Sequence, residues 1–213
     1  LHDQGPRAKG PFITVNCAAI PETFLEAELF GDERGAVTGA TQQQPGCLEL
    51  AAGGTLFLQE IGAMSRVLQA KLLQVLQEKR FGRLGGTETI TTDARIVATT
   101  NQDLEQLTAE GRFRRDLFLR LNVYPIALPP LRERQEDLGP LTMFFLMRFS
   151  AKLRKEVRGV CEDAMGWLER YPWPGNVREL EAVIEQVVAR CQGPTVTVQD
   201  LAQALREPSR VMS

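Results

Sequence analysis

The sequence has little of what metal sites and membrane spans require. It contains one histidine, His2, and four widely spaced cysteines that form no Cys-x-x-Cys pair. These residues predict neither a histidine-based metal site nor a cysteine metal cluster. No apolar run approaches the roughly 18 residues that a membrane helix needs, and the first nine residues lack the apolar part of a signal peptide. We expect a cytoplasmic protein with reduced thiols and no membrane contact.

The chain also lacks an excess of charge of either sign. Its formal net charge is −2, from 25 basic and 27 acidic residues among 213. No overall field therefore draws it to nucleic acid, and no basic stripe or helix-turn-helix pattern is present. With 43% apolar and 24% charged residues it has the composition of an ordinary globular protein. Its length suits one large domain or two modest ones.

Short apolar runs alternate with helical patterns in the first part of the chain. Residues 11–16, 55–58, 94–101 and 123–128 have the composition of strands buried in a parallel sheet. The segment at 81–92, rich in glycine and threonine, predicts a turn or hairpin. This order predicts an α/β fold built on a parallel sheet. Ser65 is expected to cap a helix with the apolar stripe Val67, Leu68, Leu72, Val75 and Leu76.

The second part of the chain has a different pattern. Pro129 and Pro130 interrupt the alternation, and we expect a domain boundary shortly after them, near Arg134. Helical patterns follow, including one that Asn176 is expected to cap. We therefore predict an α/β core at 1–134, a small all-α lid at 135–207 and a tail or linker at 208–213.

Polar residues stand where three of the expected strands stop. Ligands collect at the carboxyl ends of strands in open α/β sheets, so these positions are candidate ligand sites. They are Asn16, Gln59, Glu60, Thr100 and Asn101. A carboxylate such as Glu60 beside a fixed amide can hold a water for in-line attack on phosphate. The alternative is that each polar tip merely caps its strand.

Three arginines are candidate phosphate ligands. Arg114 and Arg120 are six residues apart on an expected helix, so they need not share a face. Either could reach a neighbour's phosphate as an arginine finger, or pair at the surface with Asp116. Arg178 stands in the first turn of a helix, where a cation is unfavourable unless it faces a bound anion. The alternative is an ion pair with Glu179, Glu181 or Glu162.

A small-residue segment lies between the first two strands. It comprises Gly35, Ala36, Val37, Thr38, Gly39 and Ala40, with neither helical nor strand periodicity. Val37 is apolar with nothing nearby to bury it, which favours a partner-contacting loop over an ordinary flexible one. A phosphate-cradling P-loop is excluded, because Pro11 and Phe12 follow Gly5 and Gly10 where lysine and a hydroxyl are required.

Taken together, seven segments resemble the central AAA+ domain of bacterial sigma-54-dependent transcription activators, also called enhancer-binding proteins. They are residues 16–20, 28–31, 35–40, 53–62, 113–117, 128–134 and 173–180. The resemblance implies a P-loop NTPase-like core with a helical lid. It also implies a ring-forming ATPase that uses ATP and magnesium to remodel sigma-54 RNA polymerase, with DNA bound only by a module outside these residues.

The resemblance assigns a role to each candidate residue. In the core, Glu60 matches the catalytic glutamate of Walker B, and Asn16 matches the asparagine that restrains it. Thr100 and Asn101 match sensor I. Arg114 and Arg120 match the arginine fingers, and Arg178 matches sensor II. Residues 35–40 match the sigma-54 contact loop, and residues 81–92 match a second surface loop.

Three departures from the family pattern matter, and two of them, Gln59 and Val37, favour an alternative function. The first strand and the Walker A loop are expected to be missing, so the chain alone is not expected to hydrolyse ATP. Gln59 stands where Walker B has an aspartate, and its amide would meet magnesium only through a water. Val37 replaces a phenylalanine in the sigma-54 contact loop. The alternative is a degenerate relative that hydrolyses nothing and acts as a binding or regulatory module.

Overall fold

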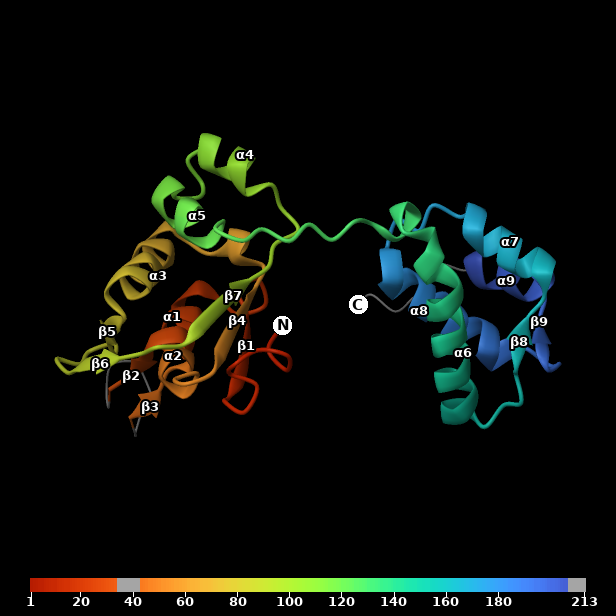
Figure 1. Ribbon diagram of the computed structural model, residues 1–213, viewed down its shortest axis with the longest axis horizontal. Helices are drawn as coiled ribbons and strands as arrows, with labels where there is room; N and C mark the ends of the chain where they lie inside the picture. Colours follow the sequence, from red (N-terminus) through yellow and green to blue (C-terminus); the bar gives the residue numbers. More distant parts are fainter. Residues whose placement is uncertain (34–42, 207–213) are drawn as a thin grey trace. The chain divides into compact units, whose positions relative to one another are not determined.

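The computed structural model describes residues 1–33 and 43–206, and the segment at 35–40 lies outside this part. The chain divides into two compact units, residues 1–125 and 126–213 (Figure 1). The division comes before the boundary expected near Arg134. Leu131 explains the difference, because it is 1% exposed within the hydrophobic core of the second unit.

The first unit is built on a parallel sheet, which confirms the predicted α/β class. The strands lie in the order β1 (Phe12–Asn16), β4 (Thr55–Gln59) and β7 (Arg95–Ala98). All are parallel, and Leu56 and Leu58 of the central strand are fully buried. The pairing of Asn16 with Gln59 shows that the strands end at a common edge.

Helices cover this sheet and share its core. Ser65 caps α3 as predicted, since its hydroxyl accepts a hydrogen bond from the Leu68 backbone at 3.4 Å. Val67, however, is 61% exposed, because it lies about 100° around the helix from Leu68 and off the buried stripe. The helices of this unit are α1 (Glu22–Phe30), α2 (Cys47–Leu50), α3 (Arg66–Glu78), α4 (Leu104–Ala109) and α5 (Arg115–Leu121), with a 3₁₀ turn η1 (Ile61–Ala63).

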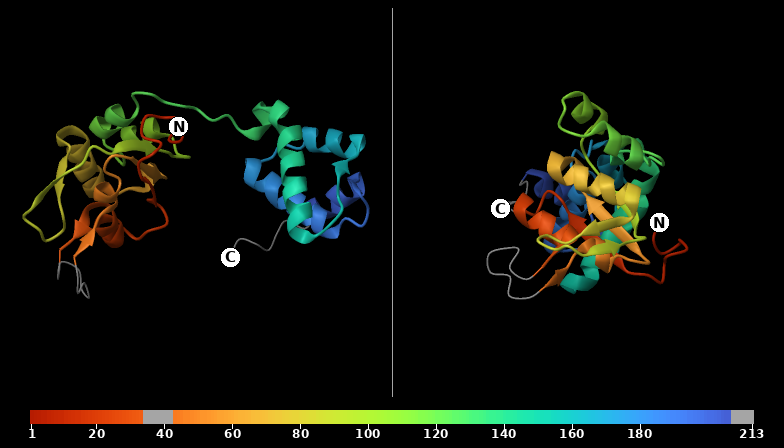
Figure 2. Two further views of the ribbon diagram at one scale, coloured as in Figure 1. Left: turned by 60° about the horizontal axis from the view of Figure 1, so that its bottom comes forward. Right: turned by 90° about the vertical axis from the view of Figure 1, so that its left-hand side faces the viewer.

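Two antiparallel strand pairs lie at one end of this unit (Figures 1 and 2). The pair β5 (Arg80–Gly82) and β6 (Thr89–Thr91) confirms the hairpin predicted at 81–92. The pair β2 (Gly31–Asp32) and β3 (Gln44–Pro45) flanks the undescribed segment. A bridge between Asp32 and Leu84 joins the two pairs.

The strand predicted at 123–128 is wrong. The segment has no strand structure, and its apolar side chains are largely exposed, with Tyr124 at 88% and Leu128 at 81%. A strand needs a hydrogen-bonded neighbour, and β7 pairs only with β4 within the described residues. An apolar run without such a neighbour remains irregular. It also straddles the division between the units at Pro125 and Ile126.

The second unit is helical around its own core, in which Trp173 is 1% exposed. Asn176 does not cap α8 as expected, because it is the first residue of that helix and has a positive φ of 53°. Its Oδ1 instead accepts a hydrogen bond from the Leu131 backbone at 2.8 Å. The elements are η2 (Leu131–Glu133), η3 (Gln135–Asp137), α6 (Leu138–Leu153), β8 (Gly159–Val160), α7 (Glu162–Arg170), α8 (Asn176–Arg190), β9 (Thr195–Val196) and α9 (Val198–Arg206). Across residues 1–33 and 43–206, no helix is long and apolar enough to span a membrane.

Candidate functional site

The polar tips of the strands meet at the carboxyl edge of the sheet. Glu60 Oε2 accepts a hydrogen bond from the backbone N–H of Asn101 at 3.3 Å, which joins the ends of β4 and β7. The backbone continues this link, since Ile61 N donates to Thr99 O at 3.0 Å. Two of the residues predicted to share a site are therefore in direct contact.

Glu60 adopts a left-handed backbone conformation, with φ 54° and ψ 50°. Residues other than glycine rarely adopt it, and it costs on the order of 1 kcal/mol or more. The conformation turns the chain sharply from β4 into η1, where Ala63 N donates to Glu60 O at 3.0 Å. This turn presents the Glu60 carboxylate at the sheet edge, where a substrate water would be held.

The neighbouring tips make local contacts. Asn16 Oδ1 accepts a hydrogen bond from Ala18 N at 3.0 Å, so its amide oxygen closes its own turn. Thr100 Oγ1 accepts from Gln102 N at 3.0 Å. Next to Asn16, burial raises the pKa of the Cys17 thiol to about 11, and the Glu60 charge contributes to the rise. The edge thus combines one carboxylate with amide and hydroxyl groups.

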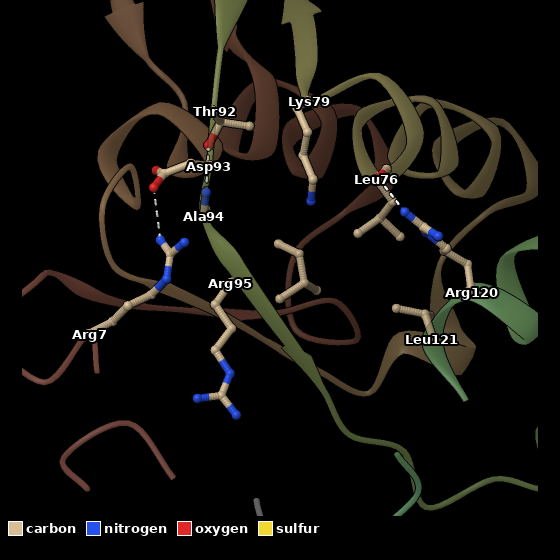
Figure 3. Close-up of a pocket in the computed structure, with 10 residues that line it drawn as sticks. Arg7, Leu76, Lys79, Thr92, Asp93, Ala94, Arg95, Arg120 and Leu121 are labelled. Carbon is tan, nitrogen blue, oxygen red and sulfur yellow. Dashed lines mark hydrogen bonds and ion pairs between the residues drawn. The ribbon is translucent and has the colours of Figure 1, made fainter. Parts of the chain in front are cut away.

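The two candidate arginine fingers occupy different surroundings. Arg114 forms two hydrogen bonds with Asp116, at 3.0 and 2.7 Å, which is the surface pair considered as an alternative. These bonds lower the pKa of Asp116 below its usual range. Arg120 Nη2 donates instead to Leu76 O at 3.2 Å (Figure 3). Arg114, just before α5, and Arg120, within it, therefore lie at separate places along α3.

Arg120 lines a basic pocket of about 550 Å³ that the sequence did not reveal. Lys79 and Arg95 also line this pocket, and Arg7 binds Asp93 there at 3.1 Å (Figure 3). Arg95 is the first residue of β7, whereas Asn101 follows that strand's carboxyl end. The basic pocket consequently lies at the opposite end of the sheet from Glu60.

Arg83 links the second surface loop, at 81–92, to the residue before the undescribed segment. It stands in the β5–β6 turn with a side chain that is 9% exposed. Its guanidinium binds Glu33, immediately before the undescribed segment, and Glu49 in α2, each at 2.9 Å. These bonds raise the pKa of Arg83 further, so it stays charged. The sequence offered only a weak signal for this residue, an arginine within a glycine-rich turn.

Arg178 lies in the second unit and is exposed in the first turn of α8. Among the residues that the structure describes, Arg178 forms none of the ion pairs with Glu179, Glu181 or Glu162 that the sequence left open. Glu179 accepts hydrogen bonds from the Tyr171 hydroxyl and the Gly175 backbone instead, and Glu181 binds Arg148 at 3.0 Å. The expectation that Arg178 faces a bound anion remains a prediction.

Comparison with known proteins decides the family. The family described as "Sigma-54 interaction domain" matches residues 1–127, and "AAA+ ATPase lid domain" matches residues 132–212. The chain belongs to the sigma-54 interaction domain family. The resemblance drawn from the sequence motifs is thereby confirmed.

Individual relatives of this sigma-54 interaction domain are regulatory proteins. Regulatory protein AtoC of Escherichia coli is 51% identical over 208 residues, which are 98% of this chain and 45% of AtoC. The Nif-specific regulatory protein of Rhodobacter capsulatus is 54% identical over 202 residues, which are 95% of this chain and 35% of that protein. The chain thus spans less than half the length of either relative.

Two solved structures with the same fold are complexes with a nucleotide. NtrX from Brucella abortus in complex with ADP superimposes with a TM-score of 0.85 at 38% identity, over 99% of this chain and 48% of NtrX. The structure of NtrX in complex with ATP gives a TM-score of 0.84 at the same identity, over 99% of this chain and 47% of NtrX. This agreement confirms the predicted AAA+ architecture for the sigma-54 interaction domain.

Proposed function

We propose that this chain is the AAA+ part of a sigma-54-dependent transcriptional regulator that couples ATP hydrolysis to remodelling of sigma-54 RNA polymerase. One observation carries the proposal: Glu60 stands beyond the central strand, with its carboxylate on the Asn101 backbone at 3.3 Å. A carboxylate at this edge of a parallel sheet is suited to activating water beside a nucleotide. The family and the nucleotide in the NtrX structures support the same function.

In this reaction Glu60 acts as general base. Its carboxylate accepts a proton from water while the water oxygen forms a bond to the γ-phosphorus and the bond to ADP breaks. Thr100 and Asn101 hold the far side of the site and orient the carboxylate. Asn16, one strand away, would restrain Glu60 until the nucleotide state changes. The fixed geometry of these groups supplies orientation before the reaction begins.

The donor set at the sheet edge fits a magnesium ion that arrives with the nucleotide. Gln59, Glu60 and Thr100 offer oxygen atoms, which are the ligands magnesium prefers. Within residues 1–33 and 43–206, no three acidic, cysteine or histidine residues cluster as a metal cage. Gln59 Oε1 would therefore accept a hydrogen bond from a water on the ion. The ion would supply charge neutralisation at the phosphates.

Three arginines would complete the site, two from a neighbouring copy and one from the lid. Arg114 and Arg120 would approach the phosphates of a neighbouring copy in a ring, where a guanidinium neutralises developing charge. Arg178 would reach the nucleotide from the lid. In the first case the Arg114–Asp116 pair must open or rotate, because it now occupies the guanidinium.

The partner surface would be the segment at 35–40 together with the β5–β6 turn. Arg83 supports this assignment, because it stands in the β5–β6 turn and binds Glu33, the residue immediately before the 34–42 segment. We place the whole function in the cytoplasm with RNA polymerase. DNA would be bound by a module outside these residues.

ATP binding and hydrolysis by the intact protein test this proposal. We expect calorimetric binding of ATP and a steady-state ATPase that Glu60→Gln lowers by at least about 100-fold without loss of binding. Gln77→Met, an exposed change on α3, serves as the control and should leave both unchanged. Absence of ATP binding by the intact protein would overturn the catalytic assignment.

A second candidate function follows from Gln59. A neutral amide in place of a carboxylate weakens the attraction for magnesium, which favours a copy that assembles with active relatives and hydrolyses nothing. Gln59→Asp in the intact protein separates the two functions. A rise from no turnover to measurable turnover supports the second function, whereas substantial activity before the change excludes it.

A further inference from the structure

Gln69 is a polar residue at the centre of an apolar helix face. It lies in α3 among the core residues Leu68, Leu72 and Leu73, and it is 0% exposed. An amide buried in this way costs free energy unless its donors and acceptor find partners. Its position in the core therefore calls for a specific set of contacts. Sequence periodicity alone gave no sign of it.

The Gln69 amide binds three backbone groups. Its Nε2 donates to Met64 O at 2.7 Å and to Arg112 O at 3.1 Å. Its Oε1 accepts from Arg114 N at 2.8 Å. Both N–H groups and the oxygen are engaged, and the two carbonyls facing Nε2 fix which way the amide points. A glutamate would place an acceptor against two acceptors, and a methionine would leave all three groups unpaired.

These partners belong to the two halves of the proposed catalytic apparatus. Met64 ends the tight turn that begins at Glu60, since Met64 N donates to Ile61 O within it. Arg114 is the residue immediately before α5, and Arg120 lies on that helix. In Figure 1, α3 and α5 lie side by side. The Gln69 amide reaches from α3 to the residue that precedes α5. One side chain thus connects the turn that carries the general base to the segment that carries the arginines.

We propose that Gln69 is a positioning residue that ties the Glu60 turn to the start of α5, and so determines how a copy presents its arginines to the neighbouring site. The inference rests on the proposed ATPase function. Glu60 serves the copy's own nucleotide, whereas the arginines serve the next copy. A shift of the Glu60 turn would then move Arg114 through two hydrogen bonds and one amide.

The tie itself is tested by hydrogen exchange on the intact protein, with no need for catalysis. Gln69→Met removes the acceptor for Arg114 N, and this amide should exchange roughly tenfold faster, as expected for the loss of one buried hydrogen bond. Gln77→Met makes the same change at an exposed site of α3 and should leave the exchange rate as it is. Unchanged exchange at Arg114 in Gln69→Met would overturn the proposal. If Gln69→Met does not fold, Gln69→Ala is used in its place, because the smaller side chain lets water reach the three backbone groups.

The catalytic consequence is tested in mixed rings. Gln69→Met alone should lower kcat by about 10- to 100-fold, since misplacement of about 1 Å has this effect, with KM for ATP changed less than about twofold. Mixing it with Glu60→Gln should raise activity above the mean of the two separate proteins. The first variant keeps its own Glu60, and the second supplies correctly placed arginines.

Mixing Gln69→Met with the double variant Arg114→Ala and Arg120→Ala should give no such gain, because both proteins then lack well-placed arginines. A general structural defect in Gln69→Met would instead abolish the gain with Glu60→Gln, and that result overturns the proposal. A wild-type protein without ATPase activity, also after Gln59→Asp, refutes the proposed function. In that case the hydrogen-exchange rate of the Arg114 amide still tests whether Gln69 connects the Glu60 turn to the start of α5.

Discussion

Arg83 donates three hydrogen bonds to the Glu49 carboxylate, two from Nη2 at 2.9 Å and one from Nε at 3.2 Å. The same guanidinium binds Glu33 at 2.9 Å through Nη1. A planar guanidinium can hold two carboxylates in fixed directions, which a lysine cannot do. The Arg83 side chain therefore adds a second connection between the β5–β6 turn and the β2–β3 pair, besides the backbone bridge between Asp32 and Leu84.

Replacing Arg83 should uncouple partner binding from hydrolysis. We expect Arg83→Met to weaken binding of sigma-54 in the ATP state by at least about fivefold, the lower end of measured couplings between sites. ATPase activity should stay within about twofold, because Glu60 lies at the other end of β4. Arg80→Met on the same hairpin is the control, since the ion pair that Arg80 forms, within the described part of the chain, is with the exposed Glu78. Equal loss in both variants would contradict the role of Arg83.

The strained backbone at Glu60 should be measurable as stability. Glu60→Gly keeps the left-handed conformation but removes the side chain that disfavours it, and we expect the unfolding free energy to rise by about 1 kcal/mol. Glu60→Ala removes the same carboxylate but keeps the strain, so it should not share the gain. Urea unfolding followed by circular dichroism compares the two. Similar stability of both variants would show that the conformation is unstrained.

Lys79 provides an independent comparison for that experiment. It also has a positive φ, of 57°, at the end of α3, far from the sheet edge. Lys79→Gly should therefore stabilise the protein by a similar amount while leaving ATPase activity intact. Glu60→Gly should abolish the activity. A gain in stability in both variants, with ATPase activity lost only in Glu60→Gly, would indicate that the strained residue Glu60 is the one required for activity.

Two buried thiols make stability fall at alkaline pH. Burial raises the pKa of Cys17 to about 11 and that of Cys47 to about 12, from a reference of 9.0, and Glu28 contributes at Cys47. In the unfolded chain these thiols lose their protons near pH 9, whereas in the folded protein they keep them. Their contribution is therefore complete below pH 9 and is lost as pH rises toward 11 and 12.

This dependence can be isolated by substitution. In the variant Cys17→Ala with Cys47→Ala, unfolding free energy should decline less steeply between pH 9 and 11 than in the wild type. Urea titrations at several pH values measure the slope. Identical slopes in the two proteins would show that the thiols ionise as readily in the folded state.

The parts that sequence predicted well depend on local pattern. The alternation of apolar runs and helices gave the parallel sheet, and the polar ends of the runs at Glu60 and Asn101 are in contact as that topology requires. The helix expected around Arg120 is also present, as α5. Each of these features is decided by residues close together in the chain or by the general geometry of parallel sheets.

The parts that sequence missed depend on distant partners. The run at 123–128 has strand composition but no hydrogen-bonded neighbour among the described residues, so composition misled. Gln69 occupies a buried position because three backbone groups from other segments require an amide there. Arg83 is likewise explained by Glu33 and Glu49, which are 50 and 34 residues away. No periodicity reports such long-range pairing.

Asn176 shows how such a distant contact can be tested in the second unit. Its Oδ1 accepts the Leu131 backbone N–H, and its φ of 53° lies in the region that asparagine tolerates better than most residues. Asn176→Ala should lose both advantages and destabilise this unit by about 1–2 kcal/mol. Asn176→Asp keeps an acceptor oxygen and should lose clearly less.

Tryptophan fluorescence reports this unit alone, because both tryptophans, Trp167 and Trp173, belong to it. The midpoint of urea unfolding should therefore shift in fluorescence for Asn176→Ala. If Asn176→Ala and Asn176→Asp are equally destabilised, the side-chain acceptor is irrelevant and the backbone conformation alone decides. If neither shifts, the Leu131 contact does not anchor the 131–137 segment to α8. A loss confined to Asn176→Ala would establish that this hydrogen bond joins the segment before α6 to the core of the second unit.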